Sequence, residues 1–324
     1  MTEQRRASPE RPNLQNAIKE TYNLGGIHTV VYKPNVPKEQ IPENGFRTVM
    51  IAPGIWCTSE HYMVSDLADF LLGQGLAVVS FDHRGIMGGK TLSKPHEYHL
   101  AHMIEDIETV KRRLKEVSQI DAGRSVGLGI SMGGVAMTYA EKKQTISRQS
   151  PLFESLVLLS PFVDIQLTAR YFSQLVKEDH TGLYLETRDG GKKYVSMDVF
   201  KKGAKKYKGI DRELLRHLRT PVGLIFGQED PQFGTTQGVQ SLPSDHLSLD
   251  QYWQSLNEQR DKFEFDETGV ARKIITINQP RKFMQIGQAF LIKGGNHNLN
   301  NSPEIIAERN RIILDRLHPA TPPF

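Results

Sequence analysis

The sequence contains the pattern Gly-x-Ser-x-Gly twice, at residues 123–127 and 129–133. A serine in this pattern becomes a nucleophile when a strand precedes it and a helix follows it directly, because the strained turn lifts its hydroxyl above the sheet. Ser131 follows an apolar run and precedes a predicted helix at residues 134–142, so it meets both conditions. Ser125 instead follows a polar loop and opens the apolar run. Ser131 is therefore the predicted nucleophile, and the Ser125 match is interpreted as coincidence.

A serine hydroxyl is a poor nucleophile until a base removes its proton, so a partner histidine is required. His297 is the best placed of the eleven histidines, because it lies in a Gly-Gly-Asn-His loop after the last predicted strand and before the last predicted helix. This position lies at the end of the sheet where the Ser131 turn is expected. His297 is therefore the predicted catalytic base.

The imidazole in turn needs an acid that fixes its tautomer. Asp230 follows the predicted strand at residues 222–226 and precedes a proline, which favours an extended backbone in a loop leaving that strand. Two other carboxylates stay open as alternatives. Glu229 is the immediate neighbour of Asp230, and Asp164 lies just after an earlier predicted strand.

Short β-rich runs alternate with longer amphipathic stretches from residue 47 onward, a pattern typical of parallel βαβ units. The fold class predicted is therefore α/β, with a mostly parallel central sheet and helices on both faces. The expected strands are residues 47–52, 76–81, 125–130, 155–159, 222–226 and 289–292, and the expected helices are 60–73, 98–117, 134–142 and 302–317.

Two segments interrupt this alternation, and we interpret both as insertions at one edge of the sheet, where lids are built. Residues 163–221 form the expected cap, with an amphipathic stretch, a hairpin around residues 189–191 and a basic run at 201–208. Residues 231–287 are polar and hold a helix candidate at 251–259. The single α/β domain is predicted to span 25–318, between an N-terminal extension at 1–24 and a mobile tail at 319–324.

Composition limits the classes of protein that the chain can form. Apolar residues make up 38% of the 324 residues and charged residues 24%, which is typical of a soluble globular protein. The formal net charge of +4 is too small to predict a nucleic-acid binder. No apolar run reaches the roughly 18 residues of a membrane span, and the polar N-terminus lacks the apolar stretch of a signal peptide. The single cysteine, Cys57, is expected to be a buried or idle thiol, and we expect a cytoplasmic protein.

Two other motifs match known sites only in part. Residues 89–91 read Gly-Lys-Thr, the ending of a phosphate-binding loop, but that motif needs a glycine where this chain has Arg84. His96, His99 and His102 are spaced by three, so their directions drift around a helix, and no carboxylate completes a metal site. The sequence therefore predicts neither a metal nor an organic cofactor.

The chain order Ser131, Asp230, His297, together with the strand-turn-helix at the serine, resembles the α/β-hydrolases over residues 25–318 outside the two insertions. The resemblance implies that backbone amides of Met132 and Ile55 form the oxyanion hole. Family members often have His-Gly where this chain has Pro53-Gly54, so Gly54 stays open as the second donor.

The turn at residues 82–85, Asp-His-Arg-Gly, also resembles the family, whose Asp-x-Arg-Gly turn follows the fourth strand. In this resemblance the turn has a structural task. Asp82 and Arg84 are expected to hold the loop and to take no part in the chemistry.

Within the α/β-hydrolases, residues 49–82 and 294–299 are similar to acyl-transferring thioesterases, among them the myristoyl-acyl-carrier-protein thioesterases of bacterial luminescence. Those enzymes lack the glycine-rich turn found here around Ser131. The resemblance implies a serine hydrolase acting on an acyl ester or thioester, with an acyl carrier protein as a further candidate partner. The basic run at 201–208 is typical of a solvated face, although it could also attract such an acidic carrier. Acyl transfer with the same triad, and a non-catalytic protein that only holds a ligand, are the alternatives.

Overall fold

A computed structural model gives the fold of the chain. It describes residues 17–162, 176–186, 191–197, 209–210, 214–215, 218–228, 267–268, 270–279 and 282–317, together with Ile165, Ala169, Ser173, Phe200, Tyr207 and Asp230. Among these residues, no helix has both the length and the apolar character needed to cross a membrane.

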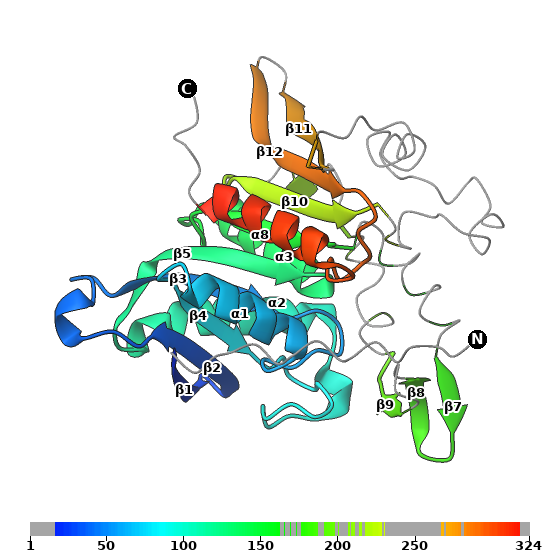
Figure 1. Cartoon of the computed structure of the whole chain (residues 1–324). Helices are drawn as coiled ribbons and strands as arrows, with labels where there is room; N and C mark the ends of the chain where they lie inside the picture. The colour runs from blue at the N-terminus through cyan, green and yellow to red at the C-terminus, as the bar shows by residue number, and fades with distance from the viewer. Residues whose placement is uncertain are drawn as a thin grey trace.

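The described residues form a nine-stranded sheet in the order β1-β2-β4-β3-β5-β6-β10-β12-β11 (Figure 1). Neighbours from β4 to β12 run parallel, and the strands at both ends of the sheet pair antiparallel. The strands are β1 (Ala17–Leu24), β2 (Ile27–Pro34), β3 (Phe46–Ala52), β4 (Ala77–Phe81), β5 (Ile120–Ile130), β6 (Leu156–Leu159), β10 (Val222–Gly227), β11 (Val270–Gln279) and β12 (Lys282–Ile292).

Helices cover both faces of this sheet (Figure 1). The apolar sides of α1 (Tyr62–Leu72) and α8 (Pro303–Leu317) pack in one hydrophobic cluster, and those of α2 (Leu100–Arg113) and α3 (Met132–Ile146) pack in the other. Short 3-10 helices span Lys38–Gln40, Pro95–Glu97 and Leu114–Glu116. The predicted α/β class, with a mostly parallel sheet between helices, is confirmed.

The sequence explains why these elements form where they do. All five residues of β4 are buried, as expected of a parallel strand that is covered on both faces. Helix α2 ends in Lys111, Arg112 and Arg113, whose charges favour the negative end of the helix dipole. At the start of α8, the Ser302 hydroxyl accepts a hydrogen bond from the Ile305 amide, as an N-cap does.

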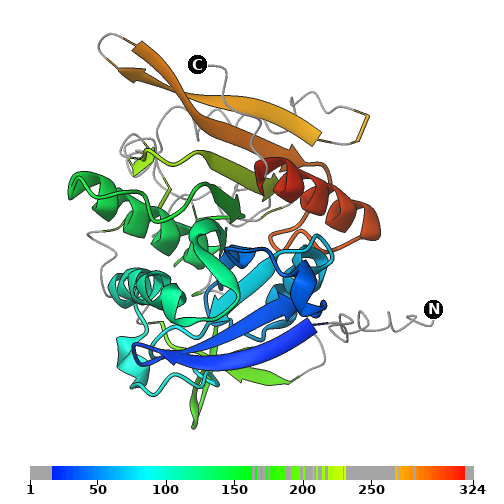
Figure 2. The ribbon, with the colours of Figure 1, turned by 90° about the vertical axis from the view of Figure 1, so that its left-hand side faces the viewer.

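A second sheet lies apart from the main one (Figures 1 and 2). It consists of β7 (Lys177–Asp179), β8 (Gly182–Glu186) and β9 (Lys192–Tyr194), and neighbouring strands pair antiparallel. The hairpin expected around residues 189–191 falls between β8 and β9, but residues 187–190 lie outside the described residues. The indole Nε1 of Trp56 donates a 3.0 Å hydrogen bond to the Ser196 carbonyl, just after β9. The predicted cap segment is therefore tied to the loop that follows β3.

The main sheet extends further along the chain in both directions than the sequence suggested. β1 lies within the predicted extension 1–24, and β11 with the first half of β12 lies within the predicted insertion 231–287. β1 and β11 are rich in polar and charged residues, so neither strand stands out as an apolar run. Each is part of the sheet through pairing with an antiparallel neighbour. The helix candidate at 251–259, most of the basic run at 201–208 and the tail at 319–324 lie outside the described residues.

Candidate active site

Ser131 lies at the turn between the end of β5 and the start of α3. Its backbone has φ 53° and ψ −121°, a conformation that residues other than glycine rarely adopt. The Ser131 amide donates a 2.8 Å hydrogen bond to the Leu159 carbonyl at the end of β6, which holds the strained turn against the sheet. Such strain is typical of a nucleophile held at the top of a strand.

The glycines around Ser131 are required by close backbone contacts. A Cβ atom on Gly129 would lie 2.4 Å from the Cα atom of Gly134, and one on Gly133 would lie 2.2 Å from the Ala52 carbonyl oxygen. Both distances are far below van der Waals contact, so no larger residue fits. The pattern Gly-x-Ser-x-Gly at residues 129–133 therefore reflects steric need.

The structure brings Ser131, His297 and Asp230 together, as the sequence predicted. The Nε2 atom of His297 lies 3.0 Å from the Ser131 hydroxyl oxygen, and its Nδ1 atom lies 2.8 Å from a carboxylate oxygen of Asp230. Because a carboxylate can only accept, Nδ1 carries the ring proton in the neutral imidazole and Nε2 is free to accept the serine proton. The Asp230 side chain is 1% exposed, whereas 27% of the His297 side chain is exposed.

The environment of His297 sets its charge. Burial favours the neutral ring, but the Asp230 carboxylate beside it favours the imidazolium, and the net effect raises the pKa of His297 above 6.5. A carboxylate that stabilises imidazolium is the electrostatic arrangement that a general base needs after it takes a proton.

Hydrogen bonds tie the loop that carries His297 to the loop that carries Asp230. The Gln228 amide donates to the Ile292 carbonyl at 2.9 Å, and the Gln228 side-chain oxygen accepts from the Gly294 amide at 3.1 Å. The two loops therefore form one unit, which fixes the distance between the acid and the base. Sequence analysis missed Gln228, although its position directly after β10 places it beside the triad.

The backbone amides expected to form the oxyanion hole lie in two segments next to Ser131. Met132 is the first residue of α3, where helical amides have no partner within the helix. Gly54 lies against Ser131, since a Cβ on it would be 3.3 Å from the Ser131 Cβ. No described residue accepts a hydrogen bond from the amides of Met132, Ile55 or Gly54. Gly54 and Ile55 both stay open as the second donor.

The other serine and the two alternative acids do not belong to the described site. Ser125 lies within β5, paired with Thr48 and fully buried, and its hydroxyl has no hydrogen-bond partner among the described residues. It is therefore a residue of the sheet, as its sequence context indicated. Glu229 and Asp164, the alternative acids, lie outside the described residues.

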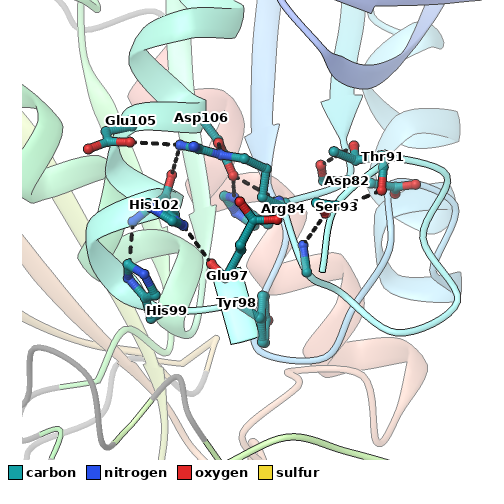
Figure 3. Close-up of polar contacts among 12 residues, drawn as sticks. Asp82, Arg84, Thr91, Ser93, Glu97, Tyr98, His99, His102, Glu105 and Asp106 are labelled. Carbon is teal, nitrogen blue, oxygen red and sulfur yellow. Dashed lines mark hydrogen bonds and ion pairs between the residues drawn. The ribbon is translucent and has the colours of Figure 1, made fainter. Parts of the chain in front are cut away.

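The turn after β4 has the structural task that the resemblance implied (Figure 3). The Asp82 carboxylate accepts hydrogen bonds from the Ser59 amide at 2.7 Å and the Lys90 amide at 2.6 Å. The Arg84 side chain pairs with Asp106 on α2 at 2.5 Å. Lys90 therefore serves the Asp82 turn, and the Gly-Lys-Thr segment does not form a phosphate cradle.

The three histidines do not form a metal site. His99 and His102 lie at the start of α2 with ring centroids 3.9 Å apart, and the Nδ1 atom of His102 is 2.9 Å from the Glu97 carbonyl (Figure 3). Within the described part of the chain, no group of three or more histidine, cysteine or carboxylate residues could hold a metal ion.

Sequence analysis also missed the aromatic side chains beside the triad. The Phe162 ring stacks on the His297 imidazole, with centroids 5.9 Å apart and planes at 28°. Phe200 of the cap packs near Phe162 and meets the Trp56 ring edge-on at 6.2 Å. Phe162 follows β6 at the same sheet edge as Ser131, which was the available signal. His297 therefore lies against an apolar wall, to which Phe200 of the predicted cap segment contributes.

The sheet order, the strained serine turn and the triad geometry define the class of this protein as an α/β-hydrolase. The family model described as "Serine aminopeptidase, S33" matches residues 44–206, half of the chain, so the chain belongs to this family of hydrolases. The matched segment contains Ser131 but ends before Asp230 and His297. No curated protein matches the sequence.

Solved structures with the same fold include both esterases and peptidases. Est1E from Butyrivibrio proteoclasticus with bound ferulic acid is 17% identical, with a TM-score of 0.54 over 92% of this chain and 99% of that one. The acylaminoacyl peptidase of Pyrococcus horikoshii is 14% identical, with a TM-score of 0.54 over 93% of this chain and 41% of that one. A puromycin-hydrolyzing peptidase of Mycobacterium tuberculosis is 16% identical, with a TM-score of 0.54 over 93% of this chain and 38% of that one. At these identities the likeness establishes the fold alone.

Proposed function

We propose that the protein is a serine hydrolase that cleaves a carboxylic ester or thioester through an acyl-serine intermediate. The observation that carries this proposal is the continuous hydrogen-bonded line from the Ser131 hydroxyl through the His297 imidazole to the Asp230 carboxylate. Each group is within the reach that proton transfer requires.

In the first half of the reaction, the Ser131 oxygen attacks the substrate carbonyl carbon while Nε2 of His297 takes the hydroxyl proton. Asp230 orients the imidazole through Nδ1 and offsets the charge that the ring acquires. The amides of Met132 and Ile55 bind the oxyanion of the tetrahedral intermediate, and each donor of this kind is typically worth about 3 kcal/mol. The intermediate then expels the alcohol or thiol, which leaves with the proton from His297.

In the second half, a water molecule takes the place of the alcohol. His297 removes a proton from the water as the water oxygen attacks the acyl-serine carbonyl, and the same two amides bind the new oxyanion. Collapse releases the carboxylic acid and returns the proton to the Ser131 oxygen. No step calls for a metal or an organic cofactor.

The apolar wall beside the triad supports an acyl substrate. Phe162 stacks on His297 and Phe200 packs behind Phe162, so the surroundings of His297 are apolar, which would favour the hydrocarbon part of an ester or thioester over a charged group. One fold neighbour, Est1E, binds ferulic acid, which is a carboxylic acid like the acid that hydrolysis of an ester would release.

Amide hydrolysis is the second candidate, because the family model describes serine aminopeptidases and two of the fold neighbours are peptidases. The same triad and amides would serve, with an amine as leaving group. Acyl transfer to an acceptor other than water would use the same first half-reaction. A protein that only holds a ligand is disfavoured, because all three triad positions are filled.

Labelling with a fluorophosphonate probe tests the nucleophile. The wild type and Ser125→Ala should be labelled, and Ser131→Ala should not. Ser125→Ala is a matched control, because it changes the other serine of the same motif. The opposite pattern would refute the assignment of Ser131.

A panel of p-nitrophenyl esters, acyl-thioesters and aminoacyl p-nitroanilides then defines the bond that is cleaved. Turnover of the esters or thioesters that is lost in Ser131→Ala supports the proposal. Turnover of the anilides alone would favour the peptidase alternative.

A further inference from the structure

We propose that Tyr98 is a positioning residue, which holds the loop that follows β3 in the conformation that forms the oxyanion hole. This inference rests on the proposed function, since it concerns the backbone donors of the same site. Tyr98 belongs to neither the triad nor the cap, and it lies directly before α2.

The loop contains a tight turn with an unusual residue at its third position. The Cys57 amide donates to the Gly54 carbonyl at 3.2 Å, which closes a four-residue turn. Trp56 has φ 57°, whereas Ile55 has no positive φ, and this combination is that of a type II turn. Glycine is the usual residue at this left-handed position, and a bulky side chain there is disfavoured. Contacts elsewhere must therefore hold the turn.

Both ends of the peptide group between Ile55 and Trp56 have a partner. The Trp56 amide donates a 2.7 Å hydrogen bond to the Tyr98 hydroxyl oxygen. On the opposite side, the Cys57 thiol donates a weaker bond to the Ile55 carbonyl, with 3.4 Å between sulfur and oxygen. A type I turn would rotate this peptide group by about half a turn and break both contacts. Tyr98 and Cys57 therefore select the type II geometry.

The geometry of this turn controls the proposed oxyanion donor. The candidate amides belong to Gly54 and Ile55, the first two residues of the turn, and Gly54 lies against Ser131. Rotation of the Ile55–Trp56 peptide would change ψ of Ile55 and φ of Trp56. Without the Tyr98 contact the whole turn is held less firmly, so the Gly54 and Ile55 amides that it carries would shift relative to Ser131. A donor that is misplaced by about 1 Å loses much of its effect on the transition state.

Tyr98 is itself held rigidly. Only 1% of its surface is exposed, and burial raises the pKa of its hydroxyl, so the phenol stays neutral. Its backbone lies against Gly85, where a Cβ would be 2.4 Å from the Tyr98 nitrogen. Gly85 has φ 75° and ends the turn held by Asp82 and Arg84 (Figure 3). The turn at residues 82–85 therefore packs against the Tyr98 backbone, and the Tyr98 hydroxyl in turn holds the loop that follows β3 through the Trp56 amide.

The test compares Tyr98→Phe with Tyr32→Phe, which removes a hydroxyl from another buried tyrosine, on β2. We expect Tyr98→Phe to lower kcat on p-nitrophenyl acetate about 10- to 100-fold, with KM changed less than about twofold, because the oxyanion forms only after binding. Tyr32→Phe should retain the wild-type kcat.

The decisive readout is the same comparison on the matching thionoester. Its transition state places charge on sulfur, a weak hydrogen-bond acceptor, so it gains less from the oxyanion donors. A positioning role predicts that Tyr98→Phe loses much less activity on the thionoester than on the oxygen ester. Equal losses on both substrates would overturn the proposal, because a general loss of structure affects both alike.

Failure of the role of Tyr98 can be distinguished from failure of the variant to fold and from failure of the proposed function. If Tyr98→Phe does not fold by circular dichroism, Cys57→Ala takes its place, and the same selective loss on the oxygen ester supports the proposal while its absence overturns it. If the wild type is inactive on the whole ester, thioester and anilide panel, or Ser131→Ala keeps its activity, the proposed function itself fails. Normal wild-type activity with an unchanged Tyr98→Phe overturns only the role of Tyr98.

Discussion

Gly227, the last residue of β10, lies backbone to backbone against Gly295 in the loop that carries His297. A Cβ atom on Gly227 would lie 2.1 Å from the Gly295 carbonyl oxygen and 2.5 Å from that of Asn296. Neither oxygen can move without moving the loop. Because Asp230 follows one of these glycines and His297 the other, this contact sets how closely the acid and the base approach.

Gly227→Ala should therefore separate the two loops and lengthen the hydrogen bond between Asp230 and His297. We expect kcat on p-nitrophenyl acetate to fall about 100-fold, because small displacements of catalytic groups cost this much. Steady-state kinetics and a thermal unfolding curve would check this. Gly123→Ala is the matched control, since a Cβ there would meet only the Asp121 side chain at 3.3 Å. Wild-type turnover in Gly227→Ala would show that the loops tolerate separation.

Asp230→Asn should reduce turnover of p-nitrophenyl esters by about 10³- to 10⁴-fold, the loss known when an amide replaces the acid of such a triad. The amide neither stabilises the imidazolium nor enforces the tautomer with its proton on Nδ1. Asp164→Asn and Glu229→Gln, measured beside it, should stay near wild type. A large loss in Asp164→Asn with little loss in Asp230→Asn would move the acid to the loop after β6.

The pH dependence of kcat/KM should follow the titration of His297. The base works only when it is unprotonated, and the Asp230 carboxylate raises its pKa above 6.5. Activity should therefore fall as the pH drops through a value above 6.5. In Asp230→Asn the raising charge is gone and burial remains, so this acidic limb should move to lower pH while the maximum falls. Identical limbs in the two proteins would contradict the pairing.

Phe200→Ala should change the preference for acyl chain length more than it changes the basal chemistry. Phe200 comes from the cap segment and contributes to the wall near His297 through its contacts with Trp56 and Phe162. Loss of this ring should lower kcat/KM on long-chain p-nitrophenyl esters by at least about tenfold, with p-nitrophenyl acetate affected much less. Equal losses on short and long chains would count against a substrate-facing role for the cap.

The triad could be predicted from sequence because each of its residues depends on local signals. Ser131 stands between an apolar strand and a helix, and His297 and Asp230 each follow a strand of the same parallel sheet. Phe162, Gln228 and Tyr98 could not be assigned a task in this way, since their contacts join segments far apart in the chain: Tyr98 meets Trp56 across 42 positions. The edge strands β1 and β11 could not be predicted for a related reason. Pairing with a neighbouring strand, and not an apolar run, places them in the sheet.

All three triad residues leave the sheet at the carboxyl ends of β5, β10 and β12, and the segment from residue 231 to 269 departs and returns at that same edge. Because both ends of this segment meet the sheet at one edge, its length and sequence can change without disturbing the strand pairing of β10, β12 and β11. Grafting the corresponding segment from another hydrolase of the fold offers a practical route to new substrate ranges on an unaltered catalytic base.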